Sequence, residues 1–355
     1  MATVVENSEF LDSNSSSAVS EKSNSSPLKS HAGKSQEQSE AQNRKAVLAN
    51  PKLIKMVKSI AIPMIGIIAF LGLWGLLAPQ VDTSLGSLPG PVEVGAQGIA
   101  LYNEWSATQV DKAAFYAAQE TRNAAAIAAG NPVQNFEYSG SPTFLDQIWT
   151  SLMTVALGFF LATIVAVPIG LICGLSKTIN AAINPLIQIM KPVSPLAWLP
   201  IVTMVISATM TDPDPSLPKS FVISAIVVML CSLWTTLINT AVGTASIDKD
   251  LLNVGRVLRL GWFAKLTRLV LPSALPYIFT GMRLSLGVGW MVLIAAEMLA
   301  QNPGLGKFVW DEFQNGSSQS LARIMFAVIV IGLIGFMLDR LMMMLENLVS
   351  RNRTV

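Results

Sequence analysis

Three ionisable side chains stand out within otherwise apolar stretches of this sequence. Arg283 and Glu297 fall in one such stretch, and Lys191 stands among four prolines in another. If the stretches cross a membrane, each charge costs about 2.5–3.5 kcal/mol on insertion scales and must have a reason to be there. A guanidinium matches a planar oxyanion through two parallel hydrogen bonds, and an ammonium attracts one as a point charge. Arg283 and Lys191 are therefore candidates for the path of an anion.

Each of these residues also has a purely structural interpretation. Arg283 can pair with Glu297 of a neighbour or extend its charged end to the membrane surface, and Lys191 can sit at the inner boundary of the membrane. A carboxylate repels anions, so we expect an ion pair or a gate at Glu297 rather than contact with substrate. Arg323 is expected to cap the outer end of the last apolar stretch.

Other kinds of chemistry find little support. The only histidine, His31, lies in a polar region, so we expect no metal site, no bound cofactor and no catalytic acid–base pair. Cys173 and Cys231 lie in apolar runs, and we expect both to be small, buried apolar side chains. Lys307 follows a short glycine-rich run, but Phe308 replaces the hydroxyl residue that a phosphate-binding loop requires. If ATP powers this protein, another chain must bind and hydrolyse it.

The apolar stretches are long enough to cross a membrane. Hydrophobic residues make up 52% of the 355 residues and charged residues only 13%, which is unlike a soluble domain. A membrane-spanning helix needs about 20 mostly apolar residues. We therefore predict an all-α, polytopic membrane protein. Its six predicted transmembrane helices lie at about 60–78, 148–174, 181–209, 221–243, 273–297 and 321–344.

The third predicted span is irregular, because it carries Pro185, Pro192, Pro195 and Pro200 around Lys191. Proline removes a helical hydrogen bond and clashes with the preceding turn, so four prolines this close cannot all sit in one straight helix. We expect a broken or kinked element that faces protein or water rather than lipid.

Lysine and arginine gather at one side of the predicted spans. They are Arg44, Lys45, Lys52, Lys55 and Lys58 before the first span, Lys249, Arg256, Arg259, Lys265 and Arg268 between the fourth and fifth, and Arg340, Arg351 and Arg353 after the sixth. The positive-inside rule makes this side cytoplasmic and places both termini there. The long loop before the second span is acidic and periplasmic, and its residues 93–129 predict one or two surface helices.

A short amphipathic helix is predicted between the fourth and fifth spans. In the loop 246–272, Leu251, Val254, Val257 and Leu258 recur at helical spacing, with charges on the other faces. Such a helix can lie on the membrane surface with its basic residues near anionic headgroups. It can also dock into a soluble partner and transmit motion. Binding to nucleic acid is the least favoured interpretation.

This loop resembles the EAA loop of ABC-importer permeases. The family pattern is Glu-Ala-Ala, three residues, Gly, nine residues, and Ile-x-Leu-Pro. Alignment on Leu271-Pro272 places Asn253-Val254-Gly255 at the Glu-Ala-Ala positions, Arg259 at the usual glycine and Leu269 at the isoleucine, while Gly261 follows two places later. The acidic residue and the glycine of the pattern are thus both replaced.

Four further segments resemble the nitrate/sulfonate/bicarbonate branch of these permeases. They are the proline-rich run 191–200, the run 271–283, Ala295–Leu299, and Gly304–Gly306 with Trp310–Glu312. The resemblance covers roughly residues 140–345 and is greatest to nitrate-import permeases, which also have the long acidic outer loop. It implies a type I ABC-importer permease fold with a coupling helix over 247–262 that binds an ATPase. The residues implied in coupling are Asp250, Asn253, Val254, Gly255, Leu258, Arg259, Gly261 and Pro272.

Composition, charge and the resemblance together divide the chain into five parts. They are a disordered polar cytoplasmic tail over 1–45, a basic segment with the first transmembrane helix over 46–80, an acidic periplasmic loop with helices over 81–146, a core permease domain over 147–345, and a cytoplasmic C-terminus over 346–355.

The function implied is that of the permease subunit of an ATP-driven importer in the bacterial inner membrane. The implied partners are cytoplasmic ABC ATPase subunits, which bind the ATP, a periplasmic or lipid-anchored anion-binding protein, and a second copy of the chain. Nitrate or nitrite is the expected substrate, with bicarbonate, cyanate and sulfonates as alternatives. A secondary transporter or channel that does not use ATP is the main rival, although such proteins usually show inverted repeats and paired broken helices.

Overall fold

The computed structural model describes residues 51–83, 86–211, 217–317 and 319–351. The polar tail predicted for 1–45 lies outside the described residues. The chain forms two compact units, 1–70 and 71–355. In the first unit, the structure describes helix α2 (Pro51–Leu77) up to Phe70, and the side chains of Ile62, Ile65 and Phe70 on this helix are exposed. Apolar exposure of this kind suits a helix that meets lipid.

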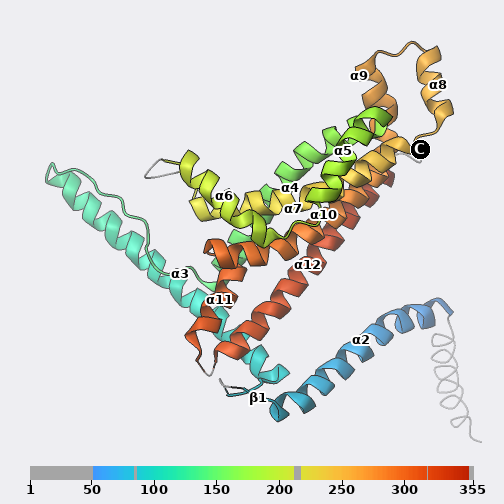
Figure 1. Ribbon diagram of the computed structural model, residues 1–355. Helices are drawn as coiled ribbons and strands as arrows, with labels where there is room; N and C mark the ends of the chain where they lie inside the picture. Colours follow the sequence, from blue (N-terminus) through green and yellow to red (C-terminus); the bar gives the residue numbers. More distant parts are fainter. Residues whose placement is uncertain (1–50, 84–85, 212–216, 318, 352–355) are drawn as a thin grey trace, which may run out of the picture. The chain divides into compact units, whose positions relative to one another are not determined.

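The second unit contains the end of α2 and all the remaining elements (Figure 1). A 3-10 turn (Ala78–Gln80) and a two-strand hairpin, in which Asp82 pairs with Ser87, lead into α3. The elements are β1 (Asp82–Thr83), β2 (Gly86–Ser87), α3 (Pro91–Ala128), α4 (Phe144–Leu175), α5 (Lys177–Met190), α6 (Pro195–Thr209), α7 (Lys219–Ala245), α8 (Lys249–Val257), α9 (Trp262–Lys265), a π-helical turn (Leu266–Val270), α10 (Leu271–Ala300), α11 (Leu305–Asn315) and α12 (Ser320–Arg351).

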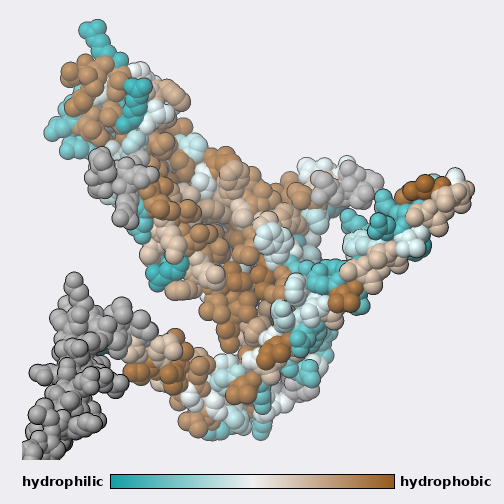
Figure 2. Space-filling view, turned by 180° about the vertical axis from the view of Figure 1, so that it is seen from behind, coloured by the Kyte–Doolittle hydropathy of each residue, from teal (hydrophilic) through white to brown (hydrophobic). Residues whose placement is uncertain are grey.

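The prediction of six spans is confirmed. Among the described residues, five helices are long and apolar enough to cross a membrane, and one bent helix pair makes the sixth span when it is counted as one. The five helices are Ala61–Gln80, Phe144–Leu175, Lys219–Ala245, Trp262–Ala300 and Ser320–Val349. Figure 2 shows mostly hydrophobic side chains over the surface of the helical body, as a bilayer requires.

The predicted break in the third span is also confirmed, because α5 and α6 meet at an angle of 100°. Lys191 is the C-cap residue that follows α5, and Ser194 caps α6 by accepting a hydrogen bond from the Leu196 N–H at 3.3 Å. Pro195 then opens α6, where its missing N–H costs nothing. Pro195 therefore begins a new helix in a new direction, whereas Pro185 and Pro200 lie within α5 and α6.

A row of small residues lets α4 lie very close to α7. The row repeats every four residues and consists of Gly158, Ala162, Ala166, Gly170 and Gly174. A β-carbon on Gly158 would lie 2.6 Å from the Ala225 carbonyl oxygen, and one on Gly174 would lie 2.6 Å from the Ala241 carbonyl oxygen. Only a small-residue row permits such an approach of two backbones in a membrane. We call this row the α4–α7 seam.

Helix α3 is a single helix of 38 residues, where the sequence predicted one or two. Its first half packs on the helical body through the buried side chains of Val94 and Leu101. Its second half is paired with the chain that returns to α4, since the Phe136 N–H donates to Gln119 Oε1 at 2.9 Å. Figure 1 shows this second half projecting from the body as an arm.

Ion pairs fix the base of the α3 arm. Lys112 of α3 pairs with Asp146 of α4 at 3.5 Å. Arg323 of α12 donates to Glu312 of α11 at 3.2 Å and also to Glu104 of α3. Arg323 thus links three helices at the start of α12, which is a larger role than the predicted cap.

Candidate coupling segment and transport path

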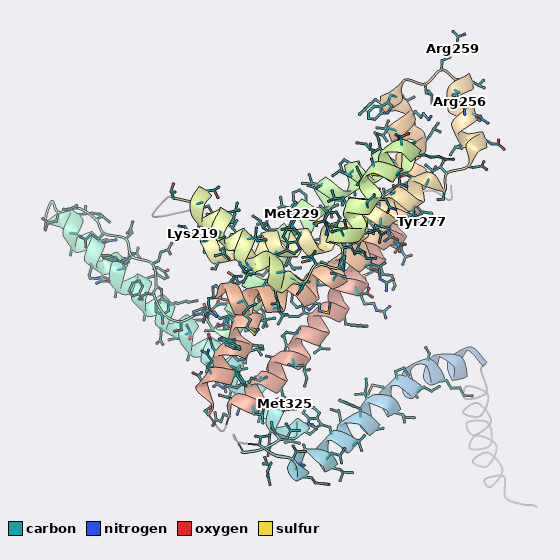
Figure 3. The ribbon with its side chains drawn as sticks, in the orientation of Figure 1. Lys219, Met229, Arg256, Arg259, Tyr277 and Met325 are labelled. Carbon is teal, nitrogen blue, oxygen red and sulfur yellow. The ribbon has the colours of Figure 1, made fainter. Side chains whose placement is uncertain are left out.

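The segment between α7 and α10 projects beyond the ends of the membrane helices. Figure 3 places Arg256 and Arg259 at its tip, at the opposite end of the body from Lys219. Asp248 caps the start of helix α8, because its Oδ1 accepts from the Asp250 N–H at 2.9 Å. All the predicted coupling residues lie on this segment except Pro272, which is in the first turn of α10 at its base.

The predicted single helix over 247–262 is too long. Helix α8 ends at Val257, and α9 begins at Trp262. Between them Arg259 has a φ of 47°, in the left-handed region, and Gly261 is extended. Side chains other than glycine reach the left-handed region at a cost of about 1–2 kcal/mol, so the chain turns here instead of continuing the helix.

The left-handed turn explains one departure from the family pattern. Arg259 aligns with the position where EAA loops carry glycine, and glycine adopts this conformation without strain. The backbone turn is therefore kept in this chain although the residue type is not.

The projecting segment exposes several large apolar side chains. Val257 is 81% exposed and Phe263 is 71% exposed. We call the group the coupling tip; its members are Val254, Val257, Leu258, Trp262 and Phe263. A contiguous apolar surface on a projection marks a site for a partner or a membrane surface. Trp262 and Phe263 escaped the sequence interpretation because they follow the turn and lie outside the helical repeat.

Gly255 connects the coupling tip to the membrane helices. It is buried, and a β-carbon there would lie 2.7 Å from Cδ1 of Leu269 in the π-helical turn that leads into α10. Asn253 is exposed, and Gly261 has open space around its α-carbon. Helix α8 therefore packs directly against the turn that leads into α10.

Arg283 forms an ion pair with Asp339, and not with Glu297 as one interpretation supposed. Its Nε lies 2.5 Å from Oδ1 and its Nη2 lies 2.9 Å from Oδ2 of Asp339, so the pair joins α10 to α12 through two hydrogen bonds. Both side chains are about one-third exposed and line a hollow of about 600 Å³ with Thr280, Gly287 and Met291. The forked donors that would bind an oxyanion are thus occupied by a carboxylate.

Asp339 was missed although a signal existed. It is an acidic residue within the sixth predicted span, and such a residue needs a partner as much as Arg283 does. The pairing itself could not be read from the sequence, because the two residues are 56 positions apart.

We expect Arg283→Ala to lower the stability of the protein and Arg283→Ala with Asp339→Ala to restore much of it. The single change leaves a carboxylate without its cation in a membrane span, at a cost of about 2.5–3.5 kcal/mol. Thermal unfolding of the purified protein in mild detergent measures both variants. Equal melting temperatures for the single and double variants would show that the pair is not structural.

Glu297 is fully buried and held by neutral donors. The Ser151 hydroxyl lies 2.8 Å from each of its carboxylate oxygens, and the Gly306 N–H donates to Oε2 at 3.0 Å. The Leu305 N–H in turn donates to Ser151 Oγ at 2.9 Å. We call this group the Glu297 cluster. It joins α4, α10 and the first turn of α11, where the helix dipole favours negative charge.

The glycine-rich run before Lys307 forms the N-cap and the first turn of α11. A β-carbon on Gly306 would collide with the Ile294 carbonyl oxygen, and one on Gly304 would collide with the Glu297 carboxylate. Lys307 pairs with Asp311 at 2.5 Å. The glycines therefore allow α11 to approach Glu297. A gating role for Glu297 stays a prediction.

Comparison with known proteins shows the family to which the chain is similar. The model of the family "Binding-protein-dependent transport system inner membrane component" matches residues 166–351. The chain is 32% identical over 308 residues to the nitrate import permease protein NrtB of Synechococcus elongatus, covering 86% of this chain and 94% of that protein. It is 33% identical over 298 residues to the bicarbonate transport system permease protein CmpB of the same species, covering 82% and 90%.

Among solved structures, an inward-facing MetNI methionine ABC transporter is similar at 12% identity with a TM-score of 0.49, over 58% of this chain and 95% of that one. The family model covers more than half of the chain. The chain therefore belongs to the family of binding-protein-dependent transport system inner membrane components, the permease subunits of ABC importers, which are transport subunits rather than enzymes and leave ATP hydrolysis to separate ATPase chains.

Proposed function

We propose that this chain forms the translocation path of an ATP-driven importer for a small inorganic anion, with nitrate as the substrate. The observation that carries the ATP-driven part is the coupling tip, an exposed apolar surface on a segment that projects from the membrane helices. Five large apolar side chains on α8, on α9 and on the turn between them suit a groove in a soluble partner, where an amphipathic helix buries its apolar face.

The charge distribution supports a cytoplasmic location for the coupling tip. Arg256, Arg259, Lys265 and Arg268 lie on this segment, and the positive-inside rule assigns such a cluster to the cytoplasm. With six spans, both termini are cytoplasmic and the α3 arm is periplasmic. Cytoplasmic ATPase subunits can then grip the tip, and a periplasmic anion-binding protein can deliver substrate at the other end.

The contact between Gly255 and Leu269 suggests how the force is transmitted. Closure of two ATPase subunits around ATP would displace α8, and α8 would displace the start of α10 through this contact. Two copies of the chain that move together would switch the path between outward-facing and inward-facing states as rigid bodies.

The identity of the anion rests on relatives with printed substrates. The nitrate import permease and the bicarbonate permease are equally similar to this chain, at 32% and 33% identity, so bicarbonate is the second candidate. Selectivity in such importers resides mainly in the separate binding protein. Uptake of isotope-labelled nitrate and bicarbonate by cells that express the complete importer, with and without this chain, distinguishes the two anions.

The coupling role predicts different effects for two changes at Arg259. Arg259→Glu keeps a side chain in the left-handed turn but reverses its charge, and we expect it to abolish uptake. Arg259→Gly relaxes the turn and removes the charge, and we expect uptake to persist at a reduced rate because the turn itself is kept. Anion uptake in cells and recovery of the ATPase with the tagged chain measure both effects.

Two outcomes would contradict the proposal. If the wild-type tagged chain recovers no ATPase partner in mild detergent, the proposed ATP-driven role of the coupling tip is wrong. If Arg259→Glu transports as well as wild type, the tip does not grip the ATPase through this turn.

A further inference from the structure

A hollow of about 200 Å³ lies between α5 and α7. Helix α5 contributes Asn180, Asn184 and Gln188 to its wall, and α7 contributes a mostly apolar surface that includes Leu237 and Ala241. We call the three carboxamides the amide row. They repeat every four residues along α5 and therefore share one face of the helix.

The face of the amide row ends at Lys191. Lys191 follows Gln188 by three residues and has helical backbone angles, with φ −55° and ψ −44°, so it continues the same face at the break between α5 and α6. Its side chain is exposed, and it forms no ion pair within the described part of the chain. This sets it apart from Arg283, whose guanidinium Asp339 already occupies.

The amide row also has donors to offer. Gln188 Nε2 donates to Asn184 Oδ1 at 3.3 Å, which uses the carbonyl of Asn184 and leaves its NH₂ group for another acceptor. A polar row of this length on a membrane-spanning element needs water or protein rather than lipid beside it. The α7 residues that line the hollow offer these carboxamides no side-chain acceptor, because all of them are apolar.

We propose that Lys191 and the amide row form an oxyanion-binding stretch on the path from the centre of the membrane to the end that carries α8. Lys191 attracts the anion at the break, and the carboxamide N–H groups replace its hydration water along α5. Because the carboxamides are neutral, they bind the anion weakly enough to release it. This inference rests on the proposed function and adds to it the groups that handle the anion.

The first test is transport by the complete importer, reconstituted in liposomes with its ATPase and binding protein and supplied with nitrate or bicarbonate. We expect Lys191→Met and Asn184→Leu each to lower the rate of anion uptake about tenfold, because each raises the barrier to passage of the anion. We expect ATP hydrolysis by the complex to stay nearly unchanged. Lys219→Met removes the same charge from the far end of α7, where Lys219 is exposed, and Gln314→Leu removes an exposed amide from α11; we expect both to transport normally.

Failure of this inference differs from failure of the proposed function. If the wild-type complex imports neither anion with ATP, the proposed function is wrong. If the wild-type complex imports one of them and the Lys191→Met and Asn184→Leu variants match it, the oxyanion-binding stretch is wrong and the proposed function stands.

A second test identifies what fills the hollow, since a lipid phosphate and a transported anion share the same chemistry. In a complete complex with Cys173→Ala and Cys231→Ala, Gln188→Cys is exposed to a charged, water-soluble thiol reagent. We expect labelling that nitrate slows, whereas Leu186→Cys on the opposite, apolar face stays unlabelled. Absence of labelling, or protection by phosphatidylglycerol in the vesicles but not by nitrate, would overturn the proposal.

Discussion

We expect Gly170→Leu to leave almost no folded protein, because it forces apart the two helices at the centre of the body. A β-carbon at this position would lie 2.6 Å from Cβ of Thr240 and 2.8 Å from the Leu237 carbonyl oxygen, both on α7. A backbone atom cannot rotate away as the end of a side chain can. The α4–α7 seam must open along its length, which costs about 3 kcal/mol or more when a packed core is overfilled.

The matched control is Gly332→Leu on α12, where a β-carbon meets nothing within 4 Å. It makes the same change on another membrane helix, and we expect an effect within about 0.5 kcal/mol. Gel filtration and thermal unfolding in mild detergent compare the two variants. Wild-type melting of Gly170→Leu would mean that α4 and α7 are not held together at this seam.

Much of the fold was predictable because its signals are local. The six spans follow from runs of apolar residues, and the break between α5 and α6 follows from Pro192 and Pro195. The α4–α7 seam was equally visible as small residues at every fourth position. It went unrecognised because small residues in an apolar run do not change its hydropathy, although they decide which helix lies against which.

The candidate site was less predictable because its contacts join distant residues. The sequence located the coupling segment, but the length of its helix depended on a left-handed residue at Arg259, which the residue type disfavours. The sequence makes Arg283 a candidate for the anion path, whereas in the structure it is paired with Asp339. Glu297 suggested an ion pair, and its partners are a hydroxyl and a backbone N–H, which no pattern of charged residues can reveal.

We expect Glu297→Ala to destabilise the protein by about 3 kcal/mol, since it leaves buried donors without an acceptor and each such group costs about 1–3 kcal/mol. The Ser151 hydroxyl and the Gly306 N–H both lose their partner, and α11 loses the negative charge at its first turn. Glu297→Gln keeps one acceptor oxygen in the same space, and we expect it to lose about 1 kcal/mol. Thermal unfolding in detergent measures both.

The comparison of these two variants also separates a structural carboxylate from a gate. Glu120→Ala on the exposed face of α3 is the control, and we expect it to melt like wild type. If Glu297 only joins α4, α10 and α11, the loss of folded protein should account for all the uptake that Glu297→Gln loses. Ser151→Ala should also lower the free energy of unfolding. If Glu297→Gln folds normally and still fails to transport, the negative charge itself acts in the transport cycle. Wild-type stability of Glu297→Ala would show that the cluster does not hold these helices together.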